Sequence, residues 1–212
     1  MKYSHIIWDF NGTILDDLKL SLESINTVLA RRNIKQIASE DEYRNLFCFP
    51  IETYYTKLGF DFDSEPYKIP ADEWIELYNN GIDDIPLTYG VIDVIKTINA
   101  NNIPQIVLSA SEKNTLLRQL NKYDLLKYFE CVLGTDDAYG KGKVDMARDW
   151  GRTSHVDFSK SVLIGDTDHD FETAQALGCN CILYCKGHMN QERLSRFGVP
   201  VISEIKELLN LL

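Results

Sequence analysis

The sequence lacks any apolar run close to the roughly 20 residues that cross a bilayer as a helix. We expect neither a signal peptide nor a transit sequence, because Met1-Lys2-Tyr3 leads directly into a strand-like pattern. We therefore expect no membrane as a partner, and we expect the chain to lie in the cytoplasm.

Positive charge is scarce in this chain. Its 22 Lys and Arg residues are outnumbered by 32 Asp and Glu residues, which gives a formal net charge of -10. Nucleic acids and anionic membranes are bound through clustered Lys and Arg, so we expect neither as a partner. An acidic protein can still bind a small phosphorylated metabolite if a lysine or a metal ion supplies local positive charge.

Cysteine is also infrequent, with five residues that match neither a zinc site nor a disulfide framework. Cys179, Cys181 and Cys185 fall in a segment that alternates like a strand. We expect reduced, half-buried structural thiols. The sequence has no internal repeat and no low-complexity tract.

Helical periodicity runs through residues 17–84, whereas strand-like and helix-like segments alternate from about Thr88 onward. Such alternation predicts right-handed βαβ units, hence a parallel sheet with helices on both faces. We therefore predict an α/β fold with a three-layer, Rossmann-like core formed by residues 1–16 and 85–212. Residues 17–84 are predicted to form an inserted all-helical cap.

The predicted strands are short buried apolar runs at Ile6–Trp8, Gln105–Ser109, Cys131–Gly134, Ser161–Ile164 and Cys181–Tyr184. The predicted helices of the core have apolar residues at helical spacing and cover Val91–Asn101, Lys113–Lys122, Val144–Trp150, Phe171–Leu177 and Ser203–Leu212.

Reactive side chains follow four of these strands. Asp9, Ser109 and Asp166 each come at a strand end, and Lys141 or Lys143 follows the strand near residue 133. Because the carboxyl ends of parallel strands share one edge of a sheet, we expect these groups to converge in one crevice. Carboxylates, a hydroxyl and a lysine can together bind Mg2+ and a phosphate.

Each of these residues also has a structural interpretation. Asp166 and Asp170, four residues apart, suit an acidic helix N-terminus, and Ser109 suits a helix N-cap. In the phosphate-binding interpretation, Ser109 and the amide of Ala110 hold phosphate oxygens. Lys143 is favoured over Lys141 as the phosphate lysine because it directly precedes an apolar helix. His169 is expected to be a solvated loop residue.

With these motifs the chain resembles the haloacid dehalogenase superfamily, in particular its phosphoglycolate-phosphatase-like branch with a helical cap. The family motif D-x-D-G-T-x-x-D is matched by residues 9–16, the second motif by Ser109, the third by a lysine, and G-D-x-x-x-D by residues 165–170. The tail around His188 also resembles the family's ending, so His188 is expected to be structural or peripheral.

The resemblance implies a Mg2+-dependent phosphohydrolase of a small phosphorylated metabolite. It implies that Asp9 attacks phosphorus to form an aspartyl phosphate. It also implies that Mg2+ is held by the side chains of Asp9 and Asp166 and by the backbone carbonyl of Asn11. Asp170 lies close by and is counted among the metal-binding residues. Gly12 is expected to let backbone amides approach the phosphate.

Asn11 departs from the family motif, which has an acid/base carboxylate at this position. Asparagine cannot donate a proton to a leaving alkoxide or activate water, a role usually worth roughly 100- to 10,000-fold. Three alternatives stay open: an attenuated or specialised phosphatase that prefers leaving groups of low pKa, a non-catalytic sensor of a phosphorylated ligand, or a substitution introduced to trap an intermediate.

Other chemistries of the family fit less well. Carbon-halogen cleavage is disfavoured because Gly165 and Asp166 are kept. Phosphonate cleavage needs a cap lysine, which the expected substrate loop, residues 47–50, lacks; Lys57 lies further on. Aromatic residues in and after that loop suit an apolar or ring-bearing leaving group, although packing of the cap helices explains them better.

Overall fold

The computed structural model describes residues 2–135 and 142–212. Lys141, the alternative phosphate lysine, lies outside the described residues. The strands of the described structure are β1 (His5–Trp8), β2 (Gln105–Glu112), β3 (Cys131–Thr135), β4 (Ser161–Gly165), β5 (Asn180–Tyr184) and β6 (Val201–Ile202).

The α-helices are α1 (Leu18–Arg31), α2 (Glu40–Leu46), α3 (Ile51–Leu58), α4 (Lys68–Gly81), α5 (Val91–Ala100), α6 (Lys113–Lys122), α7 (Lys143–Ser154), α8 (Asp168–Leu177), α9 (Gln191–Leu194) and α10 (Leu208–Leu211). Short 3-10 turns cover Ile82–Asp84, Leu126–Tyr128, Phe158–Lys160, Ser195–Phe197 and Ile205–Glu207. In the described part of the chain, none of the helices has the length and apolarity that crossing a membrane requires.

The described strands form one parallel sheet in the order β3-β2-β1-β4-β5-β6. The predicted α/β fold with a parallel sheet is therefore confirmed. The direction of strand order reverses at β1, between β2 on one side and β4 on the other. In open α/β sheets this switch point leaves a crevice at the carboxyl ends of the strands, where ligands bind.

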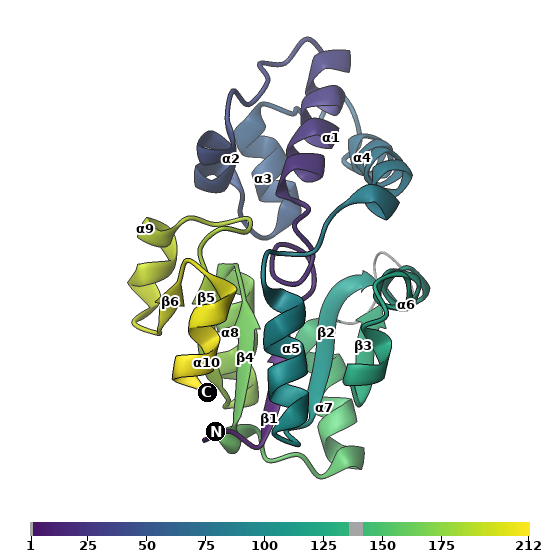
Figure 1. The fold of residues 1–212 in the computed structure, drawn as a ribbon. Helices are drawn as coiled ribbons and strands as arrows, with labels where there is room; N and C mark the ends of the chain where they lie inside the picture. The colour runs from purple at the N-terminus through teal and green to yellow at the C-terminus, as the bar shows by residue number, and fades with distance from the viewer. Residues whose placement is uncertain (1, 136–141) are drawn as a thin grey trace.

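Helices cover both faces of the sheet because successive strand side chains point to opposite sides. Ile6 and Trp8 pack with residues of α5, α6 and α10 in one apolar core, whereas Ile7 packs with residues of α7 and α8 in a second core. Figure 1 shows α5 and α10 in front of the sheet and α7 and α8 behind it.

Helices α1 to α4 gather at one end of the sheet, at the top of Figure 1. They have an apolar core of their own, in which Ile25 and Leu29 of α1 pack with Tyr43, Tyr54 and Tyr55. The two segments that join these helices to the sheet run side by side: Asp16 N donates to Pro86 O at 3.0 Å and Thr88 N donates to Ile14 O at 2.9 Å.

The C-terminal region differs from the prediction of one helix over Ser203–Leu212. A 3-10 turn at Ile205–Glu207 precedes the short α10, and the two-residue strand β6 lies before them, paired with β5. Two residues are too few to give a recognisable alternating pattern, so the sequence did not reveal β6. Strand β2 also runs beyond its predicted end, with an irregular register between Leu108 and Glu112. All five cysteines are free.

Arg32 links α1 to α4 through paired hydrogen bonds. It donates to the Glu65 carboxylate at 2.5 and 3.0 Å and to the Glu73 carboxylate at 3.0 and 3.2 Å. The Arg32 side chain is 15% exposed, whereas that of Arg31, which contacts only one Glu73 oxygen, is 52% exposed. Arg31→Ala is therefore a matched control for Arg32→Ala, because it removes the same charge from the neighbouring position but fewer contacts.

We expect Arg32→Ala to lower the free energy of unfolding by about 1–2 kcal/mol, and Arg31→Ala by less than about 0.5 kcal/mol. Hydrogen bonds from Arg32 hold the pKa of Glu73 below its ordinary value. The stabilisation is therefore present at neutral pH and is lost as the pH falls through that lowered pKa. Urea titrations from pH 7 downwards measure this effect, and a loss in Arg32→Ala that does not shrink with falling pH contradicts it.

Candidate active site

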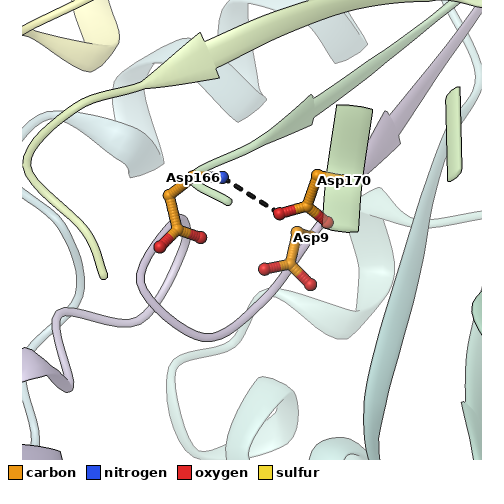
Figure 2. A group of neighbouring side chains, drawn as sticks. All are labelled: Asp9, Asp166 and Asp170. Atoms are coloured by element: carbon orange, nitrogen blue, oxygen red, sulfur yellow. Dashed lines mark hydrogen bonds between the residues drawn. The ribbon is translucent and has the colours of Figure 1, made fainter. Parts of the chain in front are cut away.

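The candidate site lies at the switch point of the sheet. Asp9 directly follows β1, and its backbone N–H donates to Ile164 O of β4 at 2.8 Å. Asp166 directly follows β4, and Asp170 lies in the first turn of α8. Figure 2 shows the three carboxylates turned toward one another, although Asp9 and Asp166 are 157 positions apart in the sequence.

One oxygen from each of these three carboxylates lies within 4.8 Å of the others, and all three residues are buried. Asp166 is held by the Thr13 hydroxyl, which donates to Oδ1 at 2.9 Å, and by the His188 N–H, which donates to Oδ2 at 2.6 Å. Asp170 Oδ2 accepts from the Asp166 N–H at 3.2 Å (Figure 2).

Asp170 also completes a capping box with Thr167, the N-cap residue of α8. The Thr167 N–H and hydroxyl donate to Asp170 Oδ2 at 3.1 and 2.7 Å. The structural interpretation of an acidic helix N-terminus is therefore correct for Asp170, and the same bonds fix the loop that carries Asp166.

Lys143 is the first residue of α7 and is buried. Its Nζ donates to Asp9 Oδ1 at 2.5 Å and to Asp170 Oδ1 at 2.7 Å. Burial opposes the charged lysine, but the two carboxylates outweigh it and raise the pKa of Lys143. Lys143 thus contacts two of the three carboxylates.

The remaining negative charge shows in the pKa values of the carboxyl groups. Burial and the charge of Asp170 raise the pKa of Asp9 well above its usual range, although Lys143 opposes the shift. Burial raises the pKa of Asp166 to about 6. Burial acts in the same direction on Asp170, but Lys143 and Thr167 outweigh it and lower the pKa of Asp170. The site therefore favours an additional cation.

Asn11 lies beside the carboxylates in a complete hydrogen-bond network. Its Nδ2 donates to the Tyr78 hydroxyl at 2.6 Å and to Asp17 Oδ2 at 3.2 Å, and its Oδ1 accepts from the Ser111 hydroxyl at 2.7 Å. An ionised carboxylate only accepts hydrogen bonds, so the partner Asp17 fixes which way the amide points.

Sequence reasoning missed Asp17, which is buried in the site. Asp17 accepts from the Gly12 N–H at 2.6 Å and from the Tyr78 hydroxyl at 2.5 Å. Burial alone raises the pKa of Asp17, but the charge of His188 and the hydrogen bonds outweigh it and lower the pKa. Asp16, the last acid of the motif, is exposed instead. The adjacent pair Asp16-Asp17 was the available signal.

His188 was expected to be structural or peripheral, and the structure contradicts only the second alternative. His188 is buried, with Nε2 at 3.4 Å from Asp17 Oδ1 and Nδ1 at 3.1 Å from the Tyr43 hydroxyl. Burial lowers its pKa, but the charges of Asp17 and Asp166 outweigh this and raise it to about 9. His188 lies here because the loop after β5 returns over the site, which no local pattern indicates.

Ser109 does not cap α6, because the N-cap of that helix is Glu112. The Ser109 hydroxyl instead accepts from the Ser111 N–H at 3.1 Å and lies 3.5 Å from Asn11 Oδ1. Ser109 and Ala110 both line the same cavity as Asp9 and Lys143.

Gly12 has φ +70°, and a Cβ there would lie 2.3 Å from Asp166 Oδ2. Only glycine fits this close approach. Its N–H donates to Asp17 Oδ1 at 2.6 Å.

A cavity of about 620 Å3 extends from Asp9 to helices α1, α3 and α4. Its walls include Asp9, Lys143 and Ser109 at one end and aromatic side chains at the other. His169 was expected in a solvated loop, but it lies in α8, lines the cavity and packs on Phe49 with ring centroids 4.9 Å apart.

Comparisons with known proteins agree with this geometry. A sequence profile described as "Haloacid dehalogenase-like hydrolase" matches residues 6–184. A phosphoglycolate phosphatase of Caulobacter vibrioides is 23% identical over 204 residues, which cover 93% of this chain and 85% of that protein.

Solved structures are similar over nearly their whole length. A predicted phosphatase from Clostridium acetobutylicum has a TM-score of 0.83 at 18% identity, covering 99% of this chain and 98% of the other. A haloacid dehalogenase-like family protein from Streptococcus pneumoniae has a TM-score of 0.84 at 16% identity, with the same coverage. At these identities the likeness establishes the fold.

Proposed function

The chain belongs to the haloacid dehalogenase-like hydrolase family, and from this membership we propose that it is a Mg2+-dependent phosphatase of a small phosphorylated metabolite. The observation that carries the proposal is the position of Asp9. This buried carboxylate lies at the switch point, paired with Lys143 and next to Asp166 and Asp170. Its place matches that of a nucleophile in a phosphate-binding crevice.

In the proposed reaction, an Asp9 oxygen attacks phosphorus and forms an aspartyl phosphate while the ester oxygen leaves. Lys143 offsets the negative charge that Asp9 and the phosphate bring together. The Ser109 hydroxyl and the backbone at Ala110 hold phosphate oxygens. Water then hydrolyses the aspartyl phosphate and restores Asp9.

The donor set fits Mg2+, which prefers carboxylate and carbonyl oxygens. We propose that Asp9, Asp166 and the backbone carbonyl of Asn11 hold the ion, with Asp170 beside it. Asp170 already accepts from Lys143 and Thr167, so its main role is to position Lys143 and the Asp166 loop. A bound Mg2+ would offset the charge of the carboxylates and polarise the phosphate.

Residues 17–84 are proposed to act as a cap. Their helices form an apolar core of their own, and residues from them line the cavity that reaches Asp9. The two adjacent connecting segments, near Asp16 and Pro86, are the place where such a cap would move. The cytoplasmic location stays a prediction from the sequence.

Asn11 favours a second candidate function, that of a non-catalytic sensor that binds a phosphorylated ligand. Its amide is fully occupied by Tyr78, Asp17 and Ser111 and has no proton to transfer. Phosphonate cleavage has less support: Lys57 donates to Cys48 Sγ at 3.2 Å, and Lys143 is the only lysine among the described residues that line the cavity.

Phosphate release from a panel of phosphate esters separates these functions. We expect release with Mg2+, loss of release after chelation with EDTA, and recovery when Mg2+ is restored. Binding of inorganic phosphate is measured in parallel by calorimetry. Phosphate binding without release from any ester would favour the sensor and exclude the phosphatase.

A further inference from the structure

The two ends of the cavity differ in chemistry. Asp9 and Lys143 lie at the end that faces the sheet, whereas rings line the end formed by the cap, among them Phe47, Tyr54 and Trp74. The volume of about 620 Å3 is in the range of small-molecule sites. A phosphate bound at Asp9 would therefore place its ester group among these rings.

The rings of the cap are packed against one another. Trp74 and Tyr78 stack with centroids 4.7 Å apart and an interplanar angle of 16°, and Phe47 and Tyr54 meet edge to face at 5.3 Å. Tyr54 is 3% exposed, and its hydroxyl has no hydrogen-bond partner within the described part of the chain. Fixed rings of this kind offer faces and edges to another ring.

The cap end offers no positive charge to a second anion. Among the described residues that line the cavity, no arginine occurs and Lys143 is the only lysine, already paired with Asp9 and Asp170. His188 is engaged by Asp17 and Tyr43.

His169 packs on Phe49, and its Nδ1 lies 3.8 Å from the Glu172 carboxylate. Asp17 and Glu112 add negative charge to the walls. A carboxylate on the leaving group would therefore lose its water without gaining a positively charged partner.

Asn11 leads independently to the same class of substrate. Since its amide cannot protonate the departing oxygen, the leaving group must be stable as an anion. A phenolate meets this requirement far better than an alkoxide does.

We infer that the preferred substrates are aryl phosphates whose aromatic leaving group is uncharged, an inference that rests on the proposed phosphatase function. The bond between phosphorus and the aryl oxygen breaks with its electron pair on the phenolate, as Asp9 forms its bond to phosphorus. Water then attacks the aspartyl phosphate, which restores the Asp9 carboxylate and releases H2PO4⁻. One of that ion's protons neutralises the phenolate.

Three esters test the inference with wild-type protein and Mg2+: phenyl phosphate, 4-carboxyphenyl phosphate and cyclohexyl phosphate. We expect kcat/KM for phenyl phosphate to exceed that for cyclohexyl phosphate by about 100-fold or more. We expect it to exceed that for 4-carboxyphenyl phosphate by about 10-fold or more, even though the carboxylate makes the phenol a slightly better leaving group.

Equal or better hydrolysis of either comparison ester overturns the inference and leaves the phosphatase function standing. If none of these esters nor any other phosphate ester is hydrolysed, the proposed function fails, and the inference fails with it.

A cap variant tests the charge argument directly. Ile75 lies on α4, is half-buried and lines the cavity. We expect Ile75→Arg to raise kcat/KM for 4-carboxyphenyl relative to phenyl phosphate by about 10-fold, whereas Ile75→Met keeps the wild-type ratio. An unchanged ratio in a folded Ile75→Arg protein overturns the argument. If that variant does not fold, the comparison of wild-type esters still decides.

Discussion

Asp9→Asn is expected to lower the turnover of every phosphate ester by about 10,000-fold or more. The amide that replaces the carboxylate is a poor nucleophile, and no other carboxylate takes the place of Asp9, because Asp170 is held by Lys143 and Thr167 and Asp166 by Thr13 and His188. Initial rates of phosphate release at saturating Mg2+ measure the effect.

The same substitution is not expected to unfold the protein. Burial and the charge of Asp170 disfavour ionised Asp9 in the folded state, as its raised pKa indicates. An acid with a raised folded pKa destabilises the fold when ionised, and the variant's amide oxygen can still accept from Lys143, whose other partner Asp170 stays charged. The variant should therefore remain folded at pH 7 in metal-free buffer.

Asp16→Asn, at an exposed acid of the same motif, is the control and should retain wild-type turnover. More than about 1% residual turnover in Asp9→Asn would point to a different nucleophile.

The sequence was sufficient to predict strands β1 to β5 of the sheet and the residues that follow them. Asp9, Ser109 and Asp166 lie near one another in the structure because parallel strands end at a common edge, a consequence of topology that alternating strand and helix patterns predict. Lys143 follows from the same argument, since α7 begins at the edge where β3 ends.

The rest of the site depends on contacts that no local pattern encodes. Tyr78 reaches Asp17 because α4 packs against α1, and Tyr43 reaches His188 because α2 lies over the loop after β5. His188 arrives from the loop after β5. Periodicity indicates which face of a helix is buried, but not which other segment buries it.

The pair formed by Asn11 and Asp17 gives the second large effect, on proton transfer. In Asn11→Asp a carboxylate would face Asp17 Oδ2, which now lies 3.2 Å from the Asn11 amide. Two carboxylates this close repel, so one of them holds a proton at neutral pH, and the fold is destabilised. The single variant therefore combines a gain in acid/base chemistry with a loss of stability.

Exchanging the two residues removes that conflict. In the double variant Asn11→Asp, Asp17→Asn, the new amide can donate to the new carboxylate and still accept from the Gly12 N–H, which now donates to Asp17 Oδ1 at 2.6 Å. The Tyr78 hydroxyl both donates and accepts, so it can reverse its two bonds. We therefore expect a higher melting temperature in the double variant than in Asn11→Asp alone.

The exchanged protein should hydrolyse cyclohexyl phosphate about 100- to 10,000-fold faster than wild type, because a carboxyl group at position 11 can protonate the departing alkoxide. In kcat/KM, which covers the reaction up to departure of the leaving group and not the later attack of water, phenyl phosphate should gain much less, since a phenolate leaves without a proton. Asp17→Asn alone is the control and should not accelerate the alkyl ester. The ratio of kcat/KM for the alkyl ester to kcat/KM for the aryl ester in the four proteins measures proton transfer to the leaving group separately from folding. A ratio that stays at the wild-type value in the exchanged protein would mean that Asn11 does not limit that transfer.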